Sequence, residues 1–494
     1  MESRQRSSHG MCRRHASPLF RPRLLCVLVL LYLGLVANAS EFLEENESVK
    51  RFREYLRIPT VHPDPHYEVA IEWLRAQASQ IGLPATIVEL VPKKPILYMT
   101  WEGSNPSLPS ILLNSHMDVV PVEREKWKYD PFEAYMEENG DIYARGSQDD
   151  KVVGIQHLEA IRRLRAQGYR PVRTIRVIFV PDEEIGSADG WGTFIDSEQF
   201  LDLNVGVMLD EGRISQNDTS YLVGHSEKSP WWLIIKAVGE PAHGSLLTDN
   251  TAMENLQKSY ESIARFRDSQ FNLVKAGLAE QTDVVSINGA YLKAGTPSDD
   301  GFTMNVQPSE AEAGFDIRVP PIAGIGAYLD KRIAEEWAPA CRNLTYYFKV
   351  RFETENGEPP ITVADDSNPW WVLIGKAVSM FDATITPGVS PGATDSRFVR
   401  VKGIPSFGFT PVKNLPALLH ANNEFMNAWE FLKGICIFEQ VLQLFGNYTD
   451  ELQGDGDESS QLAGHSKISN WSTVREANVR QPPSERSRVD LQMY

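Results

Sequence analysis

Five short clusters of acidic residues and histidine lie in order along the chain, and their side chains are of the kinds that bind divalent cations. The clusters are LLNSHMDVV, ARGSQDDK, FVPDEEIG, MLDEG and LLHANNE, and their candidate residues are His116, Asp118, Asp149, Glu183, Glu184, Asp210 and His420. Imidazole and carboxylate groups without cysteine form a hard to borderline ligand set. Such a set suits zinc, cobalt or manganese in a water-activating site, rather than a closed structural zinc. Together the clusters supply what a two-metal hydrolytic site requires.

Three of the clusters follow segments that have the composition of buried strands. These segments are Ile111–Leu113 before His116 and Asp118, residues 174–180 before Glu183 and Glu184, and residues 205–209 before Asp210. Residues two apart in a strand point to one face, so His116 and Asp118 are expected to lie side by side. Open α/β sheets place their active sites at the carboxyl ends of strands. The sequence therefore predicts that these side chains converge.

Each cluster alone also has an ordinary structural explanation. Adjacent glutamates usually belong to a solvated loop. Asp149 could simply begin the helix that follows it, since Asp favours a helix N-terminus, and His420 could be a satisfied core histidine. The functional interpretation therefore depends on the conjunction of the clusters.

With these residues in place, the chain resembles the aminoacylases of the co-catalytic zinc metallopeptidase clan, which also contains carboxypeptidases and dipeptidases. The similarity extends from about Phe52 to about Phe445. The motifs that carry it are YARGSQDDK, FVPDEEIG, LDEG, SEKSPWW, DDSNPWW, GATDSRF and FGFTP. The tryptophan pairs Trp231–Trp232 and Trp370–Trp371 are not required by metal chemistry, so they favour the aminoacylase branch of the clan.

The resemblance implies two zinc ions, with cobalt or manganese as alternatives. The implied ligands are His116, Asp149 and Asp210 for one ion and Asp149, Glu184 and His420 for the other. Asp149 would bridge the two ions, because a shared carboxylate can hold two cations about 3.5 to 4 Å apart.

The resemblance also implies roles in catalysis. Glu183 matches the general base, and Asp118 matches the residue that orients His116. His243, in GEPAHGS, matches a histidine of the smaller domain that stabilises the oxyanion and frequently comes from the partner subunit. A homodimer formed through the smaller domain follows from that role. The segment PAHGS is also typical of a simple turn.

Three further residues match positions where relatives hold the substrate carboxylate: Asn305, Arg318 and Gly392. A guanidinium suits bidentate binding of a carboxylate, although Arg318 could instead form a salt bridge at a strand edge.

The implied reaction is hydrolysis of an N-acyl L-amino acid to a carboxylate and a free amino acid, by a hydroxide that bridges the metals. Alternatives within the clan are a secreted hydrolase or synthase of N-fatty-acyl amino acids, a carboxypeptidase or a dipeptidase. A binding protein with a degraded site would lack ligands that are present here.

Composition agrees with an enzyme that acts on small molecules. The chain has 494 residues, 42% hydrophobic and 23% charged, which is typical of a globular protein with two or three cores. Its net charge of −17 disfavours nucleic acids and anionic membrane surfaces as partners.

The first 39 residues have the pattern of a secretory signal. Arginines precede the apolar run 24–36, which ends at Ala37–Ala39 and is too short for an easy membrane span. We therefore expect a secreted protein without a membrane contact after cleavage; an uncleaved anchor or a cytoplasmic location, as in many relatives, are the alternatives. Secretion agrees with glycosylation sequons at Asn46, Asn217, Asn343, Asn447 and Asn470. Cys341 and Cys436 would remain as free thiols.

The predicted fold is α/β, with a helix-flanked, mainly parallel mixed sheet in the catalytic domain and an inserted α+β lid. The predicted boundaries are a signal at 1–39, catalytic parts at 41–225 and 356–450, a lid at 226–355 and a disordered tail at 451–494. The insertion follows from the ligand assignment, because His420 must reach the same metal pair as His116. Within the lid we expect a helix at 251–266, strands at 283–287 and 313–319, and a helix from about Gly326.

Overall fold

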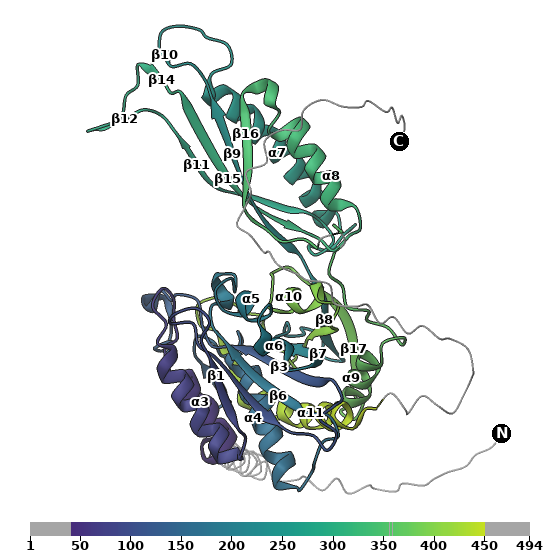
Figure 1. Cartoon of the computed structure of the whole chain (residues 1–494). Coiled ribbons are helices and arrows are strands. Elements are labelled where there is room, and N and C mark those ends of the chain that lie inside the picture. Colours follow the sequence, from purple (N-terminus) through teal and green to yellow (C-terminus); the bar gives the residue numbers. More distant parts are fainter. Residues whose placement is uncertain (1–40, 355, 358, 450–494) are drawn as a thin grey trace, which may run out of the picture.

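The structure is a computed structural model that describes residues 41–354, 356–357 and 359–449 (Figure 1). The predicted signal segment and the predicted disordered tail lie outside the described residues. Within the described part, none of the helices combines the length and the apolar character needed to cross a membrane. The chain folds into a catalytic domain and a lid that stands to one side of it (Figure 1).

The catalytic domain is built on an eight-stranded sheet with the order β1-β2-β6-β3-β7-β18-β8-β17. In this order the strands are Ala85–Val88, Ile96–Trp101, Ile175–Val180, Ser110–His116, Val205–Asp210, Ser406–Gly408, Ser220–Glu227 and Thr384–Ser390. The central strands β6, β3, β7 and β18 run parallel, whereas β2 pairs with both β1 and β6 in antiparallel fashion. The predicted mixed sheet is confirmed, and its parallel centre ends on the side where the site residues lie.

Helices cover both faces of this sheet (Figure 1). One face packs against α2 (Glu47–Leu56), α3 (Tyr67–Ile81), α4 (Lys151–Ala166), α9 (Pro369–Ser379) and α11 (Ala428–Asn447). The other packs against the short helices α5 (Trp191–Phe194), α6 (Glu198–Leu201) and α10 (Ser396–Val401). Strand β3 shows the alternation that this requires, because Ile111 and Leu113 lie in the first core and Leu112 in the second.

Smaller elements complete the catalytic domain. A three-stranded sheet contains β19 (Phe425–Asn427), β5 (Asp141–Tyr143) and β4 (Tyr135–Met136), and 3₁₀ turns occur at η1 (Arg124–Lys126) and η2 (Glu183–Ile185). Pairing of β19 with β5 is antiparallel and joins the segment after His420 to the segment before Asp149. Residues far apart in the sequence are thereby held next to each other.

The lid contains a four-stranded antiparallel sheet with the order β11-β15-β9-β16. The strands are Ser286–Ala294, Glu310–Val319, Ser229–Val238 and Leu344–Arg351, and the helical elements are α7 (Ala252–Lys275), α8 (Ile325–Arg332), η3 (Ile333–Trp337) and η4 (Ala340–Arg342). Short pairs form the distal end: β10 (Ala242–His243) with β14 (Val306–Gln307), and β12 (Pro297–Ser298) with β13 (Gly301–Phe302). The lid has its own apolar core, which includes Trp231, Leu233 and Phe315.

Three lid elements differ from the expected boundaries, and the simplest difference is in β15, which begins at Glu310 rather than at Ala313. Helix α7 continues to Lys275, beyond the expected end at Phe266, although residues after Phe266 are not buried. Strand β11 begins at Ser286 rather than at Asp283 and continues through mostly exposed residues to Ala294. Backbone pairing with β15 holds this exposed part in the sheet, so burial patterns alone do not reveal it.

Helix α4 approaches the sheet closely because of Gly154. The apolar face of α4 is buried as its periodicity predicts, with Ile155, Leu158 and Ile161 at most 1% exposed. A Cβ atom on Gly154 would lie 2.7 Å from Phe179 Cε1 and from Ser115 Oγ. This glycine therefore sets the distance between the strands and the helix that follows Asp149.

We predict that Gly154→Ala lowers the free energy of unfolding by about 1 to 3 kcal/mol, because the methyl group overpacks the interface. Alanine usually stabilises a helix interior relative to glycine by up to about 1 kcal/mol, so the sign is diagnostic. Gly326→Ala in α8 is the matched control, since its nearest neighbour, Trp231 Cη2, would be 3.5 Å away. Denaturant unfolding of both variants checks the prediction, and an equal effect of the two substitutions would contradict it.

Candidate metal centre

His116 lies at the carboxyl end of β3 and is 1% exposed. Its Nδ1 is 2.9 Å from the backbone oxygen of Asp118. That contact fixes the ring so that Nε2 points toward the other site residues, because a hydrogen bond at one ring nitrogen orients the other nitrogen for a metal. Nε2 lies 3.0 Å from Asp149 Oδ1 and 3.8 Å from Glu211 Oε2.

Asp149 stands between the two histidines. Its Oδ1 is 3.0 Å from His116 Nε2, and its Oδ2 is 3.2 Å from His420 Nε2. Burial opposes ionisation of this carboxyl, but its hydrogen bonds to His116 and His420 outweigh burial and hold its pKa below the ordinary value. An ionised carboxylate with one oxygen toward each imidazole is suited to bridge two cations.

Glu184 and His420 form the second half of the centre. Glu184 Oε2 lies 2.9 Å from His420 Nε2. The other oxygen, Glu184 Oε1, is buried and has no hydrogen-bond partner among the described residues. A buried carboxylate oxygen without a donor is costly unless a cation faces it. This orphaned oxygen fits a metal ion held by Asp149, Glu184 and His420.

The structure corrects one sequence-based ligand, because Glu211 rather than Asp210 faces His116. Asp210 is the last residue of β7, and its Oδ1 accepts a hydrogen bond from Asn114 Nδ2 at 2.9 Å. Its Oδ2 accepts from the backbone N and from Oγ of Ser396, both at 2.8 Å. Both oxygens of Asp210 are thus engaged within the protein. Glu211, the first residue beyond the strand, points into the centre.

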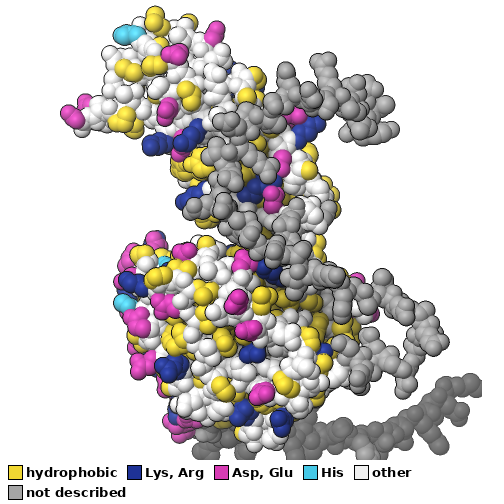
Figure 2. Space-filling view, in the orientation of Figure 1, with side chains coloured by type: hydrophobic (Ala, Val, Ile, Leu, Met, Phe, Trp, Pro, Cys, Tyr) yellow, Lys and Arg dark blue, Asp and Glu magenta, His cyan; other side chains and the backbone are white. Residues whose placement is uncertain are grey.

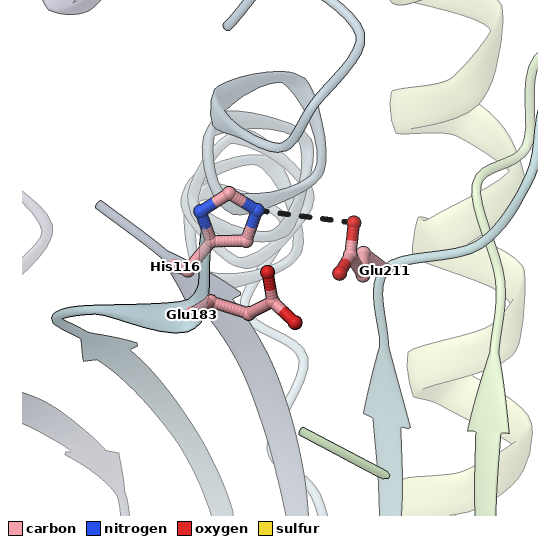
Figure 3. Close-up of side chains that lie close together, drawn as sticks. All are labelled: His116, Glu183 and Glu211. Carbon is pink, nitrogen blue, oxygen red and sulfur yellow. Dashed lines mark ion pairs between the residues drawn. The ribbon is translucent and has the colours of Figure 1, made fainter. Parts of the chain in front are cut away.

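Glu183 lies close to His116 and Glu211. Figure 3 shows His116, Glu183 and Glu211 pointing toward one another from the ends of neighbouring strands, and ligand atoms of the three residues lie within 4.8 Å of one another. Burial, and then the negative charge of Glu211, raise the pKa of Glu183 well above its ordinary value. Burial and the charge of Asp149 do the same for Glu211. The carboxylates of Glu183, Glu211 and Asp149 repel one another when ionised, and divalent cations would supply the positive charge that offsets this repulsion.

Asp118 holds the turn that carries the two glutamates. Its Oδ1 accepts from the backbone N of Glu183 and its Oδ2 from that of Glu184, both at 3.1 Å. Oδ2 is also 2.8 Å from His62 Nε2. The contact of Asp118 with His116 Nδ1 is made by its backbone oxygen, whereas Oδ1 is 3.6 Å away. The aspartate side chain therefore positions Glu183 and Glu184 more directly than it orients the imidazole.

The site opens into a cleft of about 2200 Å³ that is lined by both domains. Asp149, Glu183, Glu184 and His420 line its catalytic side. Apolar residues that also line it are Ile185, Leu222, Leu419, Trp232, Phe348 and Phe352. A cleft with a few charged groups and mostly apolar walls is typical of a small-molecule site.

The sequence-predicted substrate residues are divided between two places. Arg318 and Gly392 line the cleft. Arg318 also forms an ion pair with Asp316, with 2.8 Å between Nε and Oδ1. His243 and Asn305 are exposed at the distal end of the lid, on or beside β10 and β14, away from the catalytic domain (Figure 1). One copy of the chain does not bring His243 to the candidate metal centre.

A family model described as peptidase family M20/M25/M40 matches residues 112–444, which include all five clusters. The chain belongs to this family.

Curated M20 relatives include the aminoacylase-1 of Mus musculus, which is 43% identical over 81% of this chain and 95% of the relative. Aminoacylase-1 of Dictyostelium discoideum is 41% identical over 81% of this chain and 98% of the relative. These identities confirm that the chain is an aminoacylase relative within the M20 family.

Solved structures show the same M20 fold. A metallo-carboxypeptidase from Sulfolobus solfataricus has a TM-score of 0.61 at 18% identity, covering 81% of this chain and 99% of that one. Human carnosine dipeptidase 1 has a TM-score of 0.58 at 13% identity, covering 83% of this chain and 99% of that one. The catalytic sheet with an inserted lid is thus the fold of the family.

Sequence reasoning missed Glu424 as well as Glu211. Glu424 is buried, and its Oε1 accepts from the backbone N of Gln148 at 2.6 Å and of Asp149 at 3.3 Å. Its Oε2 lies 2.8 Å from Arg145 Nη1. Glu424 therefore supports the turn that presents Asp149. The only sequence signal was its proximity to His420.

We predict that Glu211→Gln removes about one of two bound ions, because a neutral amide is a poor replacement for a carboxylate ligand. Asp210→Asn should keep both ions, because the Asp210 oxygens accept hydrogen bonds from Asn114 and Ser396 and are not ligands of either ion. Metal content of the purified variants after dialysis, measured by inductively coupled plasma spectrometry, separates the two. Loss of metal in Asp210→Asn alone would restore the original assignment.

Proposed function

We propose that the protein is a metal-dependent aminoacylase that hydrolyses N-acyl L-amino acids to a carboxylate and a free amino acid. The observation that carries this proposal is the convergence of His116, Asp149, Glu183, Glu184, Glu211 and His420 at the floor of one cleft. The identity with aminoacylase-1 from two distant organisms supports the substrate class.

The proposed cofactor is a pair of zinc ions, with cobalt or manganese as alternatives. His116, Asp149 and Glu211 would hold one ion, and Asp149, Glu184 and His420 the other. When bound, such ions polarise the amide carbonyl and lower the pKa of water toward about 7. The donor set fits these ions, because it consists of imidazoles and carboxylates, and because Glu184 Oε1 has no hydrogen-bond partner among the described residues.

Glu183 is the proposed general base. Its carboxylate takes a proton from the attacking water as the new C–O bond forms, and returns it to the amine nitrogen as the C–N bond breaks. The backbone contact with Asp118 keeps this carboxylate at the centre. Arg318 and the loop around Gly392 would hold the substrate carboxylate from the walls of the cleft.

A homodimer is proposed because two site residues lie too far from the centre in a single chain. The end of the lid that carries His243 and Asn305 also exposes large apolar side chains. Leu246, Leu247, Phe302 and Met304 are 57%, 106%, 60% and 90% exposed, and hydrophobic side chains are visible at this end of the lid (Figure 2). Such groups are typical of a surface that is covered by a partner. A second copy would bring His243 to the oxyanion, and Asn305 to the substrate carboxylate.

Secretion is the proposed location, on the strength of the amino-terminal sequence pattern. Among the described sequons, Asn343 lies on the lid and Asn217 on the catalytic domain, so glycans would decorate both. Cys341 and Cys436 are unpaired in the described part of the chain.

We predict that the wild-type protein hydrolyses N-acetyl-methionine and that Glu183→Gln lowers kcat by about 10² to 10⁴-fold while keeping both metals. The amide side chain is nearly isosteric but cannot accept the proton. Release of methionine, measured together with metal content, tests both statements. Wild-type-like turnover by the variant would refute the role of Glu183.

The same assay distinguishes the alternatives within the family. An N-oleoyl amino acid and a dipeptide are compared with N-acetyl-methionine at equal concentration. Higher kcat/KM on the oleoyl substrate would indicate an N-fatty-acyl amino acid hydrolase, and higher kcat/KM on the dipeptide a peptidase. Either result would overturn the proposed substrate class.

For the dimer, we predict that His243→Ala alone loses about 10² to 10³-fold in kcat, as for a lost oxyanion donor. Mixing it with Glu183→Gln should restore activity, because a heterodimer contains one site with both an intact base and an intact His243. About one quarter of wild-type turnover is expected at equal mixing. No recovery after subunit exchange, shown by differently tagged chains, would argue against a histidine supplied by the partner.

A further inference from the structure

Two consecutive buried residues lie where the chain leaves the catalytic domain for the lid. Glu227 ends β8, Lys228 follows it, and β9 of the lid begins at the next residue. They are 3% and 2% exposed. The proposed chemistry uses neither of them, yet charged side chains are rarely buried without a specific partner.

Glu227 faces the catalytic domain. One carboxylate oxygen accepts a hydrogen bond from the backbone N of Thr394, and the other lies 2.9 Å from Arg400 Nη1. Arg400 is itself buried and donates from Nε to the backbone oxygen of Ser406 at 3.2 Å. A single carboxylate thus ties the exit of the chain to the segment that follows Gly392.

Lys228 faces the lid. Its Nζ donates to the backbone oxygen of Gln281 at 3.0 Å and to Ser286 Oγ at 2.8 Å. Its backbone N donates to the oxygen of Ser390, at the beginning of the Gly392 loop, at 2.9 Å. Because side chains alternate along an extended chain, the adjacent side chains of Glu227 and Lys228 bind different domains.

The segment Thr394–Arg397 connects this joint to the metal centre. Asp395 accepts from Ser187 Oγ at 2.6 Å and from Asn114 Nδ2 at 3.1 Å. Ser396 donates hydrogen bonds from its backbone N and its Oγ to Asp210, the residue before Glu211. Arg397 Nη2 donates to the backbone oxygen of Gly186 at 3.0 Å. One short segment therefore contacts all three strand ends that present His116, the glutamate turn and Glu211.

We infer that Glu227 is a positioning residue that, together with Lys228, sets the Gly392–Arg397 segment according to the orientation of the lid. Rotation of the lid moves the backbone between these residues and, with it, Thr394 and Ser390. The segment then carries the displacement to the wall that holds the substrate and to the turn that bears Glu183. This inference rests on the proposed aminoacylase reaction.

The test is steady-state hydrolysis of N-acetyl-methionine by Glu227→Gln, which removes the charge with little change in shape. We expect kcat/KM to fall about tenfold or more, as for loss of a buried hydrogen bond to a charged group, with two metals retained. Because Arg400 is then left unpaired, the charge-neutral double variant Glu227→Gln/Arg400→Gln is measured as well and should show the same loss.

Lys228→Met is the second variant, since it keeps the apolar stem but removes both bonds to the lid. We expect KM to rise and kcat to fall, each several-fold, because the segment carries the orientation of the lid both to the wall that holds the substrate and to the turn that bears Glu183. Glu439→Gln is the control: its pair with Arg163, 3.2 Å apart, lies away from the cleft, so its kinetics should equal wild type.

The inference is overturned if Glu227→Gln and Lys228→Met both keep KM and kcat within about twofold of wild type, whatever their thermal stability. A merely structural role would lower the unfolding temperature without changing KM of the folded enzyme. Lack of turnover by the wild-type protein would instead contradict the proposed function, so the two failures are distinguishable.

Discussion

The structure of the site depends on Asp149, whose two carboxylate oxygens face different histidines. Oδ1 lies 3.0 Å from His116 Nε2, and Oδ2 lies 3.2 Å from His420 Nε2. These histidines are separated by most of the chain and by the inserted lid. For one carboxylate to reach both, the final part of the chain must return to the sheet from which β3 emerges. The insertion of the lid is thus a consequence of completing this site.

Rigid surroundings keep the acids together despite their mutual repulsion. Glu424 accepts hydrogen bonds from the turn that presents Asp149, and Asp118 accepts them from the turn of Glu183 and Glu184. Both supports are buried carboxylates, and each acts on backbone N–H groups that cannot easily move. These backbone N–H groups bind the supporting carboxylates of Glu424 and Asp118. Glu184 Oε1 has no such donor, so it remains available to a cation.

Much of this arrangement follows from local patterns, and the exceptions have physical reasons. Strand composition followed by polar residues predicted that His116, Glu183 and Glu184 lie at the carboxyl ends of strands, whereas the roles of Asp149 and His420 came from the resemblance. The prediction of Asp210 as a ligand was wrong, because the residue that faces the centre depends on where β7 ends and on donors from Asn114 and Ser396, which are distant in sequence. His243 lies at the far end of the lid, and its proposed role depends on a second chain, so the periodicity of one chain carries no information about that role.

The most direct test of the account is anomalous diffraction at the zinc edge from crystals grown with zinc. The account predicts two peaks about 3.5 to 4 Å apart on either side of the Asp149 carboxylate, one beside His116 and Glu211 and the other beside Glu184 and His420. A single peak, or two peaks of which only one contacts Asp149, would contradict the bridged centre on which the proposed chemistry depends.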